Sequence, residues 1–489
     1  MSDVTEDKDI QIVKYEHGST PSSVEEEINS KKFVKSDAEK RYVRKLNMRL
    51  LPIAGLVVFV QFIDKSILSV AAIIGIIEDT GMTYSQYSWL GSLFYLGYLV
   101  YQLPNNYILQ KVPVGRYLGV MLFFWGALTI ATGFCKNFTQ LAVTRVLLGL
   151  FESASYPVLL LIFNTMYRRS EQSACFGFLW FMNGFASIVG SASAVGVAKM
   201  KPVNGLVAWR MGYVIWGTIT IGIAILVFFF LIDSPESRWL SVTPEERAII
   251  EERTRDNAVV RKRKVSTQQY WEALKEPRFY LIFIMAMLNG LQNGALVLFA
   301  NVLVKSLGFT TFQSILLQIP SGTISSGFVI VAVILHRKTG QLAYTGLVLT
   351  VVSAVGCLLL AVLPQSGVKL LGYYLQWTSS GTYTLTVVII SSTVSGYSKK
   401  IFYNGMLMIS YTLGNFVGPL MMVAHEAPTY KSAMWGYFAA NIVVILSFYL
   451  VRRWLARINK KKAAGRTDTP TDVNLNLTDR EDPNWSYLL

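Results

Sequence analysis

Long apolar runs separated by short polar connections make up most of this chain. In the first half the runs lie at roughly 50–75, 87–109, 117–135, 138–163, 173–198 and 209–232, and in the second half at about 279–303, 311–335, 342–363, 368–392, 401–424 and 434–456. A helix of about 20 mostly apolar residues is long enough to cross a bilayer. The pattern therefore predicts an all-α membrane protein with twelve transmembrane helices in two six-helix bundles.

The polar segments divide the chain into five predicted parts. These are a disordered cytoplasmic N-terminal tail (1–46), a first bundle (47–232), a central cytoplasmic linker (233–278), a second bundle (279–456) and a cytoplasmic C-terminal tail (457–489). Ser36 and Glu39 have the spacing of a capping box, which predicts a short helix leading into the first span. Thr243 and Glu246 give the linker the same kind of helix start, and we expect that helix to end near Asp256.

Composition and charge agree with a membrane location. Of the 489 residues, 52% are hydrophobic and 15% are charged, whereas soluble domains carry about 25% charged residues. The net charge of +15 comes mostly from basic residues beside the spans, such as Arg41 and Lys45 before the first and Arg452 after the last. Such residues favour the cytoplasmic side, so we expect a multi-pass protein of the plasma membrane with both termini cytoplasmic. The polar tail beyond Lys462 is expected to be mobile.

The same distribution of charge indicates a lipid bilayer around the protein rather than a nucleic-acid partner. The three histidines, His17, His336 and His425, all lie outside the predicted spans, so neither a metal site nor another cofactor is expected. No nucleophile and base are arranged within the spans as an enzyme would need. We therefore do not expect an enzyme, and we expect the protein to be a monomer.

Four charged residues stand within the apolar runs of the first bundle. Asp64 and Lys65 are adjacent in the first run, and Arg145 and Glu152 lie seven residues apart in the fourth. A charge at the centre of a membrane helix costs about 3 kcal/mol on insertion scales, so such residues usually have a function. Arg145 and Glu152 should share one helix face about 10 Å apart, too far for an easy ion pair. Each therefore needs a ligand or another helix as partner, and a purely structural role is the alternative.

The second bundle offers neutral hydrogen-bonding groups instead, among them Asn293 and Asn415. A small anion could be held by the two cations, Arg145 and Lys65, and oriented by these amides. The protonation of a carboxyl group in a low-dielectric cavity depends on neighbouring charge. The two acids of the first bundle are therefore candidates for proton coupling, with Glu152 responding to the charge of Arg145. A static charge network is the alternative.

Several sequence stretches resemble the fungal allantoate permease family, a group of anion:cation symporters in the major facilitator superfamily. They include FIDKSILSVA (62–71), QYSWLGSLFYLGY (86–98), KVPVGRYL (111–118), LLQIPSG (316–322), GNFVGP (414–419), HEAPTY (425–430) and LTDREDPN (477–484). The resemblance covers nearly the whole chain and implies the major facilitator fold. It also implies uptake of small carboxylates with protons, such as allantoate, ureidosuccinate, short peptides, vitamins or sulfur-containing acids.

The resemblance further implies roles for individual residues. Symporters of this wider group have an acid followed by a base on the first span and an Arg and a Glu seven apart on the fourth. Asp64, Lys65, Arg145 and Glu152 match these positions, although the base of the first pair is Lys here rather than Arg. The positions where substrate contacts are expected are occupied by Tyr98, Asn183, Asn293 and Asn415.

The sequence thus favours a secondary active transporter that imports a small organic anion by proton symport through alternating access. An electrogenic facilitator of the same substrates, in which the acids are structural, is an alternative within the same class. A nutrient sensor that uses a transporter fold without transporting is an alternative from another class.

Overall fold

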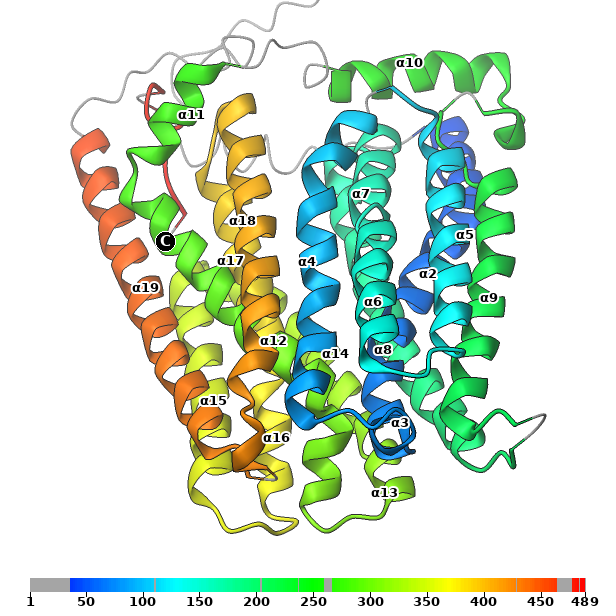
Figure 1. Ribbon diagram of the computed structural model, residues 1–489. Coiled ribbons are helices and arrows are strands. Elements are labelled where there is room, and N and C mark those ends of the chain that lie inside the picture. The colour runs from blue at the N-terminus through cyan, green and yellow to red at the C-terminus, as the bar shows by residue number, and fades with distance from the viewer. Residues whose placement is uncertain are drawn as a thin grey trace, which may run out of the picture.

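The structure, a computed structural model, describes residues 36–109, 111–202, 205–235, 237–258, 266–427, 429–463, 477–482 and 484–488. The expectations for residues 1–35 and 464–476 of the two tails lie outside the described residues. Within the described ranges the regular elements are helices, gathered into two bundles (Figure 1). The all-α architecture predicted from the apolar runs is confirmed.

The helices follow one another along the chain with short connections. Those of the first half are α2 (Asp37–Ile73), α3 (Ile76–Asp79), α4 (Tyr84–Ile108), α5 (Val114–Thr132), α6 (Phe138–Glu152), α7 (Ser155–Met166), α8 (Arg169–Ala198) and α9 (Ala208–Phe230). Between the halves lie a 3-10 helix (Arg238–Leu240), α10 (Pro244–Ala258) and α11 (Thr267–Leu274). Those of the second half are α12 (Pro277–Ser306), α13 (Thr311–Leu316), α14 (Gln318–Thr339), α15 (Leu342–Val362), α16 (Lys369–Gln376), α17 (Ser379–Thr393), α18 (Tyr397–Val417), 3-10 turns at Gly418–Met421 and Ala424–Glu426, and α19 (Lys431–Ala463).

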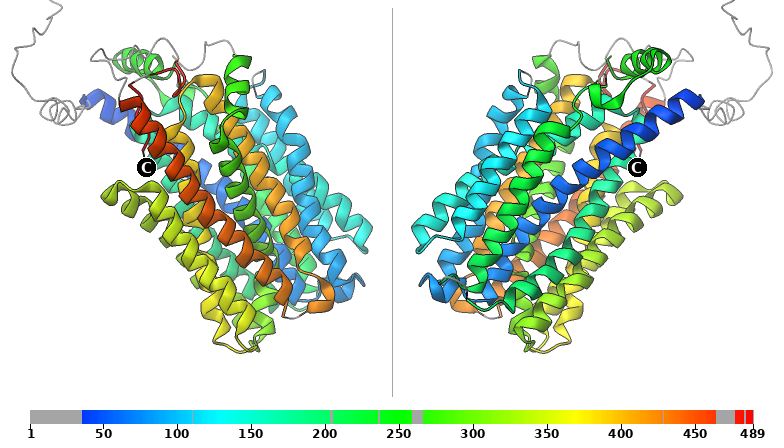
Figure 2. Two further views of the ribbon diagram at one scale, coloured as in Figure 1. Left: turned by 90° about the vertical axis from the view of Figure 1, so that its left-hand side faces the viewer. Right: turned by 90° about the vertical axis from the view of Figure 1, so that its right-hand side faces the viewer.

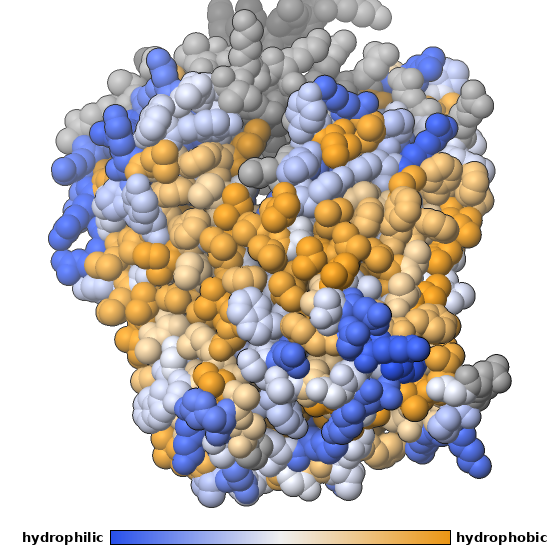
Figure 3. All heavy atoms as spheres, viewed as in Figure 1, coloured by the Kyte–Doolittle hydropathy of each residue, from blue (hydrophilic) through white to orange (hydrophobic). Residues whose placement is uncertain are grey.

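Nine helical segments in the described part of the chain are long and apolar enough to cross a membrane. The other three predicted spans correspond to α4, to α16 with α17, and to α18. α4 and α18 carry buried polar side chains such as Asn105 and Asn415, and α16 and α17 are each short. The helices are therefore consistent with twelve spans, of which the three more polar or interrupted ones depart from a simple apolar pattern. Hydrophobic side chains cover much of the middle of the face in Figure 3, and hydrophilic ones gather toward its ends.

The first span belongs to one long helix rather than to a short helix followed by a span. Ser36 caps α2, because its Oγ accepts a hydrogen bond from the backbone N–H of Glu39 (3.2 Å). The helix then continues for 37 residues to Ile73, with Pro52 inside it. Figure 2 shows this helix in blue, extending past the end of its bundle. The predicted helix start is confirmed, but residues 37–46, which we expected to lie in the disordered tail, belong to this helix.

The fourth predicted span is interrupted beside one of its charged residues. α6 ends at Glu152 and α7 begins at Ser155. Pro157 stands in the first turn of α7 and cannot donate a hydrogen bond to the carbonyl oxygen of Ser153, so the sequence carries a sign of the break that the apolar pattern hides. Interrupted helices are tolerated at membrane depth where they are buried in protein, and Glu152 is fully buried.

Glycines bring the helices that carry the charged and amide residues close to their neighbours. A Cβ atom at Gly149 of α6 would lie 1.8 Å from the carbonyl oxygen of Phe94 in α4. A Cβ atom at Gly414 of α18 would lie 1.9 Å from the carbonyl oxygen of Met287 in α12. Small residues allow such close backbone approach between membrane helices. The α4–α6 and α12–α18 pairs are therefore fixed units on which the site is built.

The two ends of the molecule differ in how the halves meet. We call the end with α10 and α11 the linker face and the end with α3 and α13 the opposite face (Figure 1). Toward the opposite face, the Tyr87 hydroxyl donates to the carbonyl oxygen of Leu298 (2.7 Å) and the Asn301 backbone N–H donates to Ser69 Oγ (3.0 Å). One hydrophobic cluster there joins both halves, whereas the two other large clusters each belong to one half. The halves are thus packed together at the opposite face.

Ion pairs hold the linker region against the first half at the linker face. Thr243 and Glu246 form the predicted start of α10: the Glu246 backbone N–H donates to Thr243 Oγ1 (3.2 Å). The Glu246 carboxylate also pairs with Lys45 of α2 (2.9 Å). Arg253 of α10 pairs with Glu39 of α2 (2.6 Å). The expected linker helix is therefore present, and it is attached to the first span.

The described part of the C-terminal tail, residues 477–488, is docked onto the second half. Asp479 is fully buried and accepts hydrogen bonds from Arg278 of α12 (2.9 Å) and Lys399 of α18 (2.8 Å). The Tyr487 hydroxyl donates to the same carboxylate (2.7 Å). The expectation of a mobile tail is wrong for these residues, because their acid lies against two buried cations.

Candidate functional site

Lys65 and Glu152 form an ion pair across the interior of the first bundle. Lys65 Nζ on α2 lies 3.0 Å from Glu152 Oε1 at the end of α6. The Gln61 side chain, one turn before Lys65, donates to the same oxygen (2.8 Å). Glu152 has no exposed surface, while the Lys65 side chain keeps 26% of its surface exposed. The cation of this pair is therefore reachable from the interior space, and the acid is not.

Arg145 lies on α6, two helical turns before Glu152, and its hydrogen-bond partner is a neutral side chain. Its guanidinium donates to the Tyr213 hydroxyl of α9 (2.6 Å) and lies 5.9 Å from the centre of that ring. Arg145 is 3% exposed, and its Nε–H has no hydrogen-bond acceptor. In the part of the chain that the structure describes, no carboxylate lies within ion-pair distance of Arg145. Arg145 thus keeps an unused donor, and no direct ion pair within the described residues neutralises its charge.

Asp64 does not pair with the adjacent Lys65. Its Oδ1 accepts a hydrogen bond from Thr129 of α5 (3.2 Å), and its buried Oδ2 has no partner. Arg145 is the strongest of the cations whose charge acts on this carboxylate, ahead of Lys65. Neighbours along a helix point in different directions, so the two residues of the adjacent pair face different helices.

The structure corrects the expected interaction of Glu152. From the sequence we expected its carboxylate to respond to the charge of Arg145 on the same helix, but its ion-pair partner is Lys65. The expectation that Arg145 and Glu152 would not pair with each other agrees with their separate partners, Tyr213 and Lys65. The four charges therefore form two neighbouring groups, Lys65 with Glu152 and Arg145 near Asp64.

Tyrosines from both halves surround Lys65. Tyr95 and Tyr98 of α4 and Tyr156 of α7 all lie near its ammonium group. From the second half, Tyr411 of α18 is close enough to interact with Tyr95, Lys65 and Tyr156. The Tyr411 ring is tilted against that of Tyr383 of α17, with ring centroids 4.3 Å apart. Lys65 is thus the charged member of a group of tyrosines that spans both bundles.

The predicted amide contacts divide into accessible and enclosed residues. Asn183 of α8 is half-buried and donates weakly to the Tyr156 hydroxyl (3.4 Å), which brings it to the tyrosine group. Asn293 of α12 is also half-buried and donates to Asn415 Oδ1 (2.9 Å). Asn415 is fully buried, and its own N–H donates to the carbonyl oxygen of Tyr411 (2.8 Å). Asn415 is therefore placed to position Asn293 and α18 rather than to touch a ligand.

Sequence reasoning missed several residues of this site, among them Gln61 and three tyrosines. Gln61 precedes Lys65 by four residues and so shares its helix face, a signal that was present in the sequence. Tyr156, Tyr213 and Tyr383 lie in apolar runs, where a tyrosine is as often a packing residue as a ligand contact. Nothing in their local sequence indicates which charged residue they reach. Among the described residues, no group of three or more His, Cys, Asp or Glu side chains could hold a metal ion.

The two-bundle helical fold, with charged side chains enclosed among its helices, is that of a multi-pass membrane transporter. Residues 54–419 match the Major Facilitator Superfamily, and the chain belongs to that superfamily. It is 32% identical over 469 residues to the uncharacterized transporter C417.10 of Schizosaccharomyces pombe, covering 93% of this chain and 90% of that one. It is 30% identical over 474 residues to the allantoate permease of Saccharomyces cerevisiae, covering 92% and 87% of the two chains.

A solved structure supports the fold independently. A bacterial homolog to the human lysosomal transporter Spinster, in its inward-facing and occupied conformation, matches with a TM-score of 0.65 and 15% sequence identity. The match covers 86% of this chain and 98% of that one. The match to the superfamily and the relationship to allantoate permease confirm the family that the sequence motifs resemble.

Proposed function

We propose that this protein is a proton symporter that imports a small organic anion by alternating access. The observation that supports the proposal most strongly is the ion pair of partly accessible Lys65 with fully buried Glu152. A carboxylate on a substrate and the carboxylate of Glu152 can compete for the same ammonium group. Protonation of Glu152 removes one competitor, so the proton and the anion can favour each other's binding.

Each of the four charges has a distinct role in this mechanism. A proton reaching Glu152 breaks its ion pair and leaves Lys65 free to bind the substrate carboxylate. Arg145, held by Tyr213, offers its unused Nε–H as a second donor for the anion. Asp64 has an unpaired oxygen in the same region and is the second candidate for carrying a proton. Two acids would allow more than one proton to accompany a monovalent anion.

The second bundle supplies the other wall of the binding site. Asn293, positioned by Asn415, and Asn183 with Tyr98 are the proposed substrate contacts around the two cations. Binding of an anion between the bundles would draw them together, which is how substrate promotes the switch between faces in transporters built from two halves. The contacts that join the halves at the opposite face would then have to break.

The orientation follows from the distribution of basic residues and is part of the proposal. With both termini in the cytoplasm, the linker face is cytoplasmic and the sealed opposite face is external. The structure would then correspond to a state that exchanges substrate with the cytoplasm. We propose that the protein works as a monomer in the plasma membrane.

The substrate class rests on the two cations and on the relationship to allantoate permease. A test is uptake of radiolabelled allantoate by the purified protein in liposomes, with other small carboxylates as competitors. We expect competition by carboxylates and accumulation that increases as the external pH falls and is lost when a protonophore collapses the gradient. Saturable uptake that ignores pH and protonophore would instead support the electrogenic facilitator. Absence of uptake for the whole panel, with binding retained, would support the nutrient sensor.

A further inference from the structure

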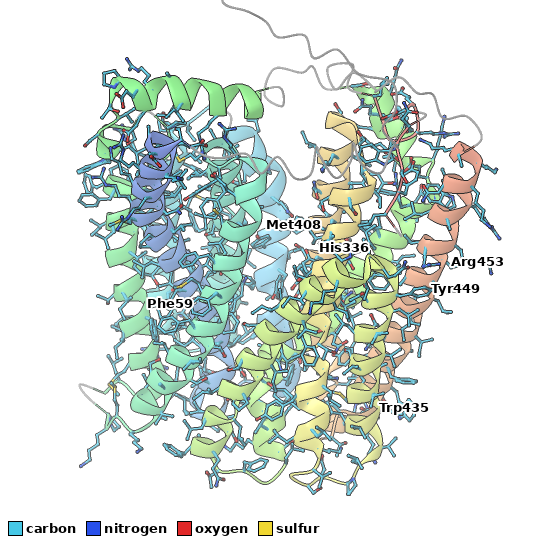
Figure 4. All side chains as sticks on the ribbon, turned by 180° about the vertical axis from the view of Figure 1, so that it is seen from behind. Phe59, His336, Met408, Trp435, Tyr449 and Arg453 are labelled. Atoms are coloured by element: carbon cyan, nitrogen blue, oxygen red, sulfur yellow. The ribbon has the colours of Figure 1, made fainter. Side chains whose placement is uncertain are left out.

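A buried lysine at the opposite face lies far along the chain from the transport site. Lys369 begins α16, directly after the connection from α15, and only 2% of its surface is exposed. It lines a small cavity between α12, α15, α16 and the start of α19. The start of α19 lies toward the opposite face, as the position of Trp435 in Figure 4 shows, while Arg453 lies nearer the other end of this helix.

The Lys369 ammonium group has no counter-ion in the part of the chain that the structure describes. Among the described residues no hydrogen bond or ion pair reaches its Nζ, and no carboxylate is found in the lining of the cavity. The charge that acts on it most directly is that of Lys431, which has the same sign. Glu426 lies shortly before the start of α19, but its carboxylate accepts a hydrogen bond from the backbone N–H of Ser432 (2.8 Å) rather than from Lys369.

The hydroxyl groups that line the cavity do not compensate for the missing negative charge. Thr429 donates to the carbonyl oxygen of Glu426 (3.1 Å), Tyr373 donates to Gln318 (2.6 Å), and the other lining residues are mostly apolar. A buried charge without a partner is unfavourable, so it is normally paired or neutralised. The innermost space in the cavity, about 20 Å³, suffices for a particle the size of one water molecule, and the cavity opens to solvent on one side, which leaves room for the rest of a small acid.

We propose that this cavity is a binding site for a small monovalent anion, distinct from the transport site and facing the other side of the protein. The ligand is a halide or the carboxylate group of a small acid, because one negative charge on a small group matches one buried ammonium group. Because its residues all belong to the second half, the site does not depend on how the two halves meet. Binding would join the end of α12 to the starts of α16 and α19.

The experiment measures anion binding in a protein whose transport site is disabled. The Arg145→Gln variant serves as background, and chloride binding is followed by the line width of its ³⁵Cl NMR signal in detergent solution. We expect a saturable broadening that Lys369→Gln weakens roughly tenfold or more, that Lys369→Arg retains, and that Lys199→Gln leaves unchanged. Lys199→Gln is the matched control, because it removes one positive charge from the same face of the protein. Lys199 lies over the Phe312 ring and does not line the cavity.

Competition between chloride and formate distinguishes a halide site from a carboxylate site. Displacement of chloride by formate indicates a site for either anion, and formate-dependent stabilisation without chloride binding indicates a carboxylate site. If Lys369→Gln does not fold, the thermal unfolding midpoint of the background protein provides the second measurement, and we expect it to rise with chloride or formate. Broadening that persists in Lys369→Gln, or no effect of either anion on the background protein, would overturn the proposal.

Discussion

Lys65 and Glu152 come from different helices, yet their charged groups lie 3.0 Å apart, and only the lysine is partly exposed. The ion pair is formed across the interface between α2 and the end of α6, where Gln61 also donates to Glu152. Anything that neutralises Glu152 therefore releases Lys65. In the proposed mechanism, this relationship makes the protonation of Glu152 and the binding of an anion to Lys65 mutually dependent.

The Glu152→Gln variant imitates the permanently protonated acid. We expect it to lose accumulation driven by a proton gradient, because the side chain can no longer gain and release a proton. It should retain exchange of internal for external substrate, because Lys65 remains free to bind the anion. Counterflow and gradient-driven uptake in liposomes, measured on the same preparation, distinguish the two activities.

Asp64→Asn serves as the comparison, since Asp64 is also acidic but is bonded to Thr129 instead of a cation. We expect a reduced proton-to-substrate ratio in this variant. If both variants still concentrate substrate against its gradient, neither acid couples transport to protons.

Arg145→Gln should abolish measurable uptake while leaving the protein folded. Hydrogen bonds to charged groups contribute about 1.5–3 kcal/mol each, and the glutamine supplies neither the charge nor the fork of donors. Tyr213→Phe tests positioning separately, because it removes the partner of Arg145 but keeps the charge. We expect it to raise the half-saturation concentration about tenfold. Saturable uptake by Arg145→Gln at a normal rate would assign this arginine a structural role.

The sequence predicted the spans and the enclosed charges because both are local features. An apolar run is long enough to span the membrane whatever its neighbours, and a charge such as Arg145 stands out within it. The partners of the charges were not predictable in the same way. Lys65 bonds Glu152 rather than Asp64 because of how α2 is rotated against α6, and that rotation is set by packing across the bundle.

The docked tail was missed for a different reason. A polar segment beyond α19 resembles a mobile tail in composition, yet Trp485 packs against the hydrophobic core of the second half and Asp479 is buried. The sequence did contain one sign of local order, the spacing of Thr478 three residues before Glu481. In the structure the Glu481 side chain accepts a hydrogen bond from the backbone N–H of Thr478 (2.9 Å). The sequence does not reveal that Arg278 and Lys399 are buried side by side where the tail reaches them.

Asn293 and Asn415 should affect transport in a coupled manner. Asn293→Ala removes a half-buried amide, and we expect a higher half-saturation concentration with little change in maximal rate. Asn415→Ala removes its hydrogen-bond partner (2.9 Å) and should raise the same quantity through Asn293. The double variant should then lose less than the sum of the two single effects. Additive effects would show that Asn415 acts independently, through the packing of α18 on α12.

Asp479 provides a prediction on stability and pH. Burial alone would raise the pKa of this carboxyl, but Arg278 and Lys399 hold it below the ordinary value of 3.8. A depressed pKa in the folded state means that the interaction stabilises the protein above pH 3.8 and is lost as the pH falls through the folded-state value. We expect Asp479→Asn to destabilise the protein by about 3–5 kcal/mol at neutral pH, and the difference from the wild type to shrink below pH 3.8.

The measurement is thermal unfolding of both proteins in detergent between neutral and acidic pH. Asp482→Asn is the matched control, because it removes the same charge from the same segment, and its carboxylate accepts the backbone N–H of Asn484 (2.9 Å) rather than Arg278 or Lys399. A protein truncated after Ala463 should be destabilised like Asp479→Asn, and a soluble peptide of residues 477–488 should restore part of the loss. The loss arises because Arg278 and Lys399 are both buried and each keeps one partner fewer when the tail is absent. Equal unfolding midpoints for Asp479→Asn and Asp482→Asn would show that the docked tail contributes nothing to the stability of the second half.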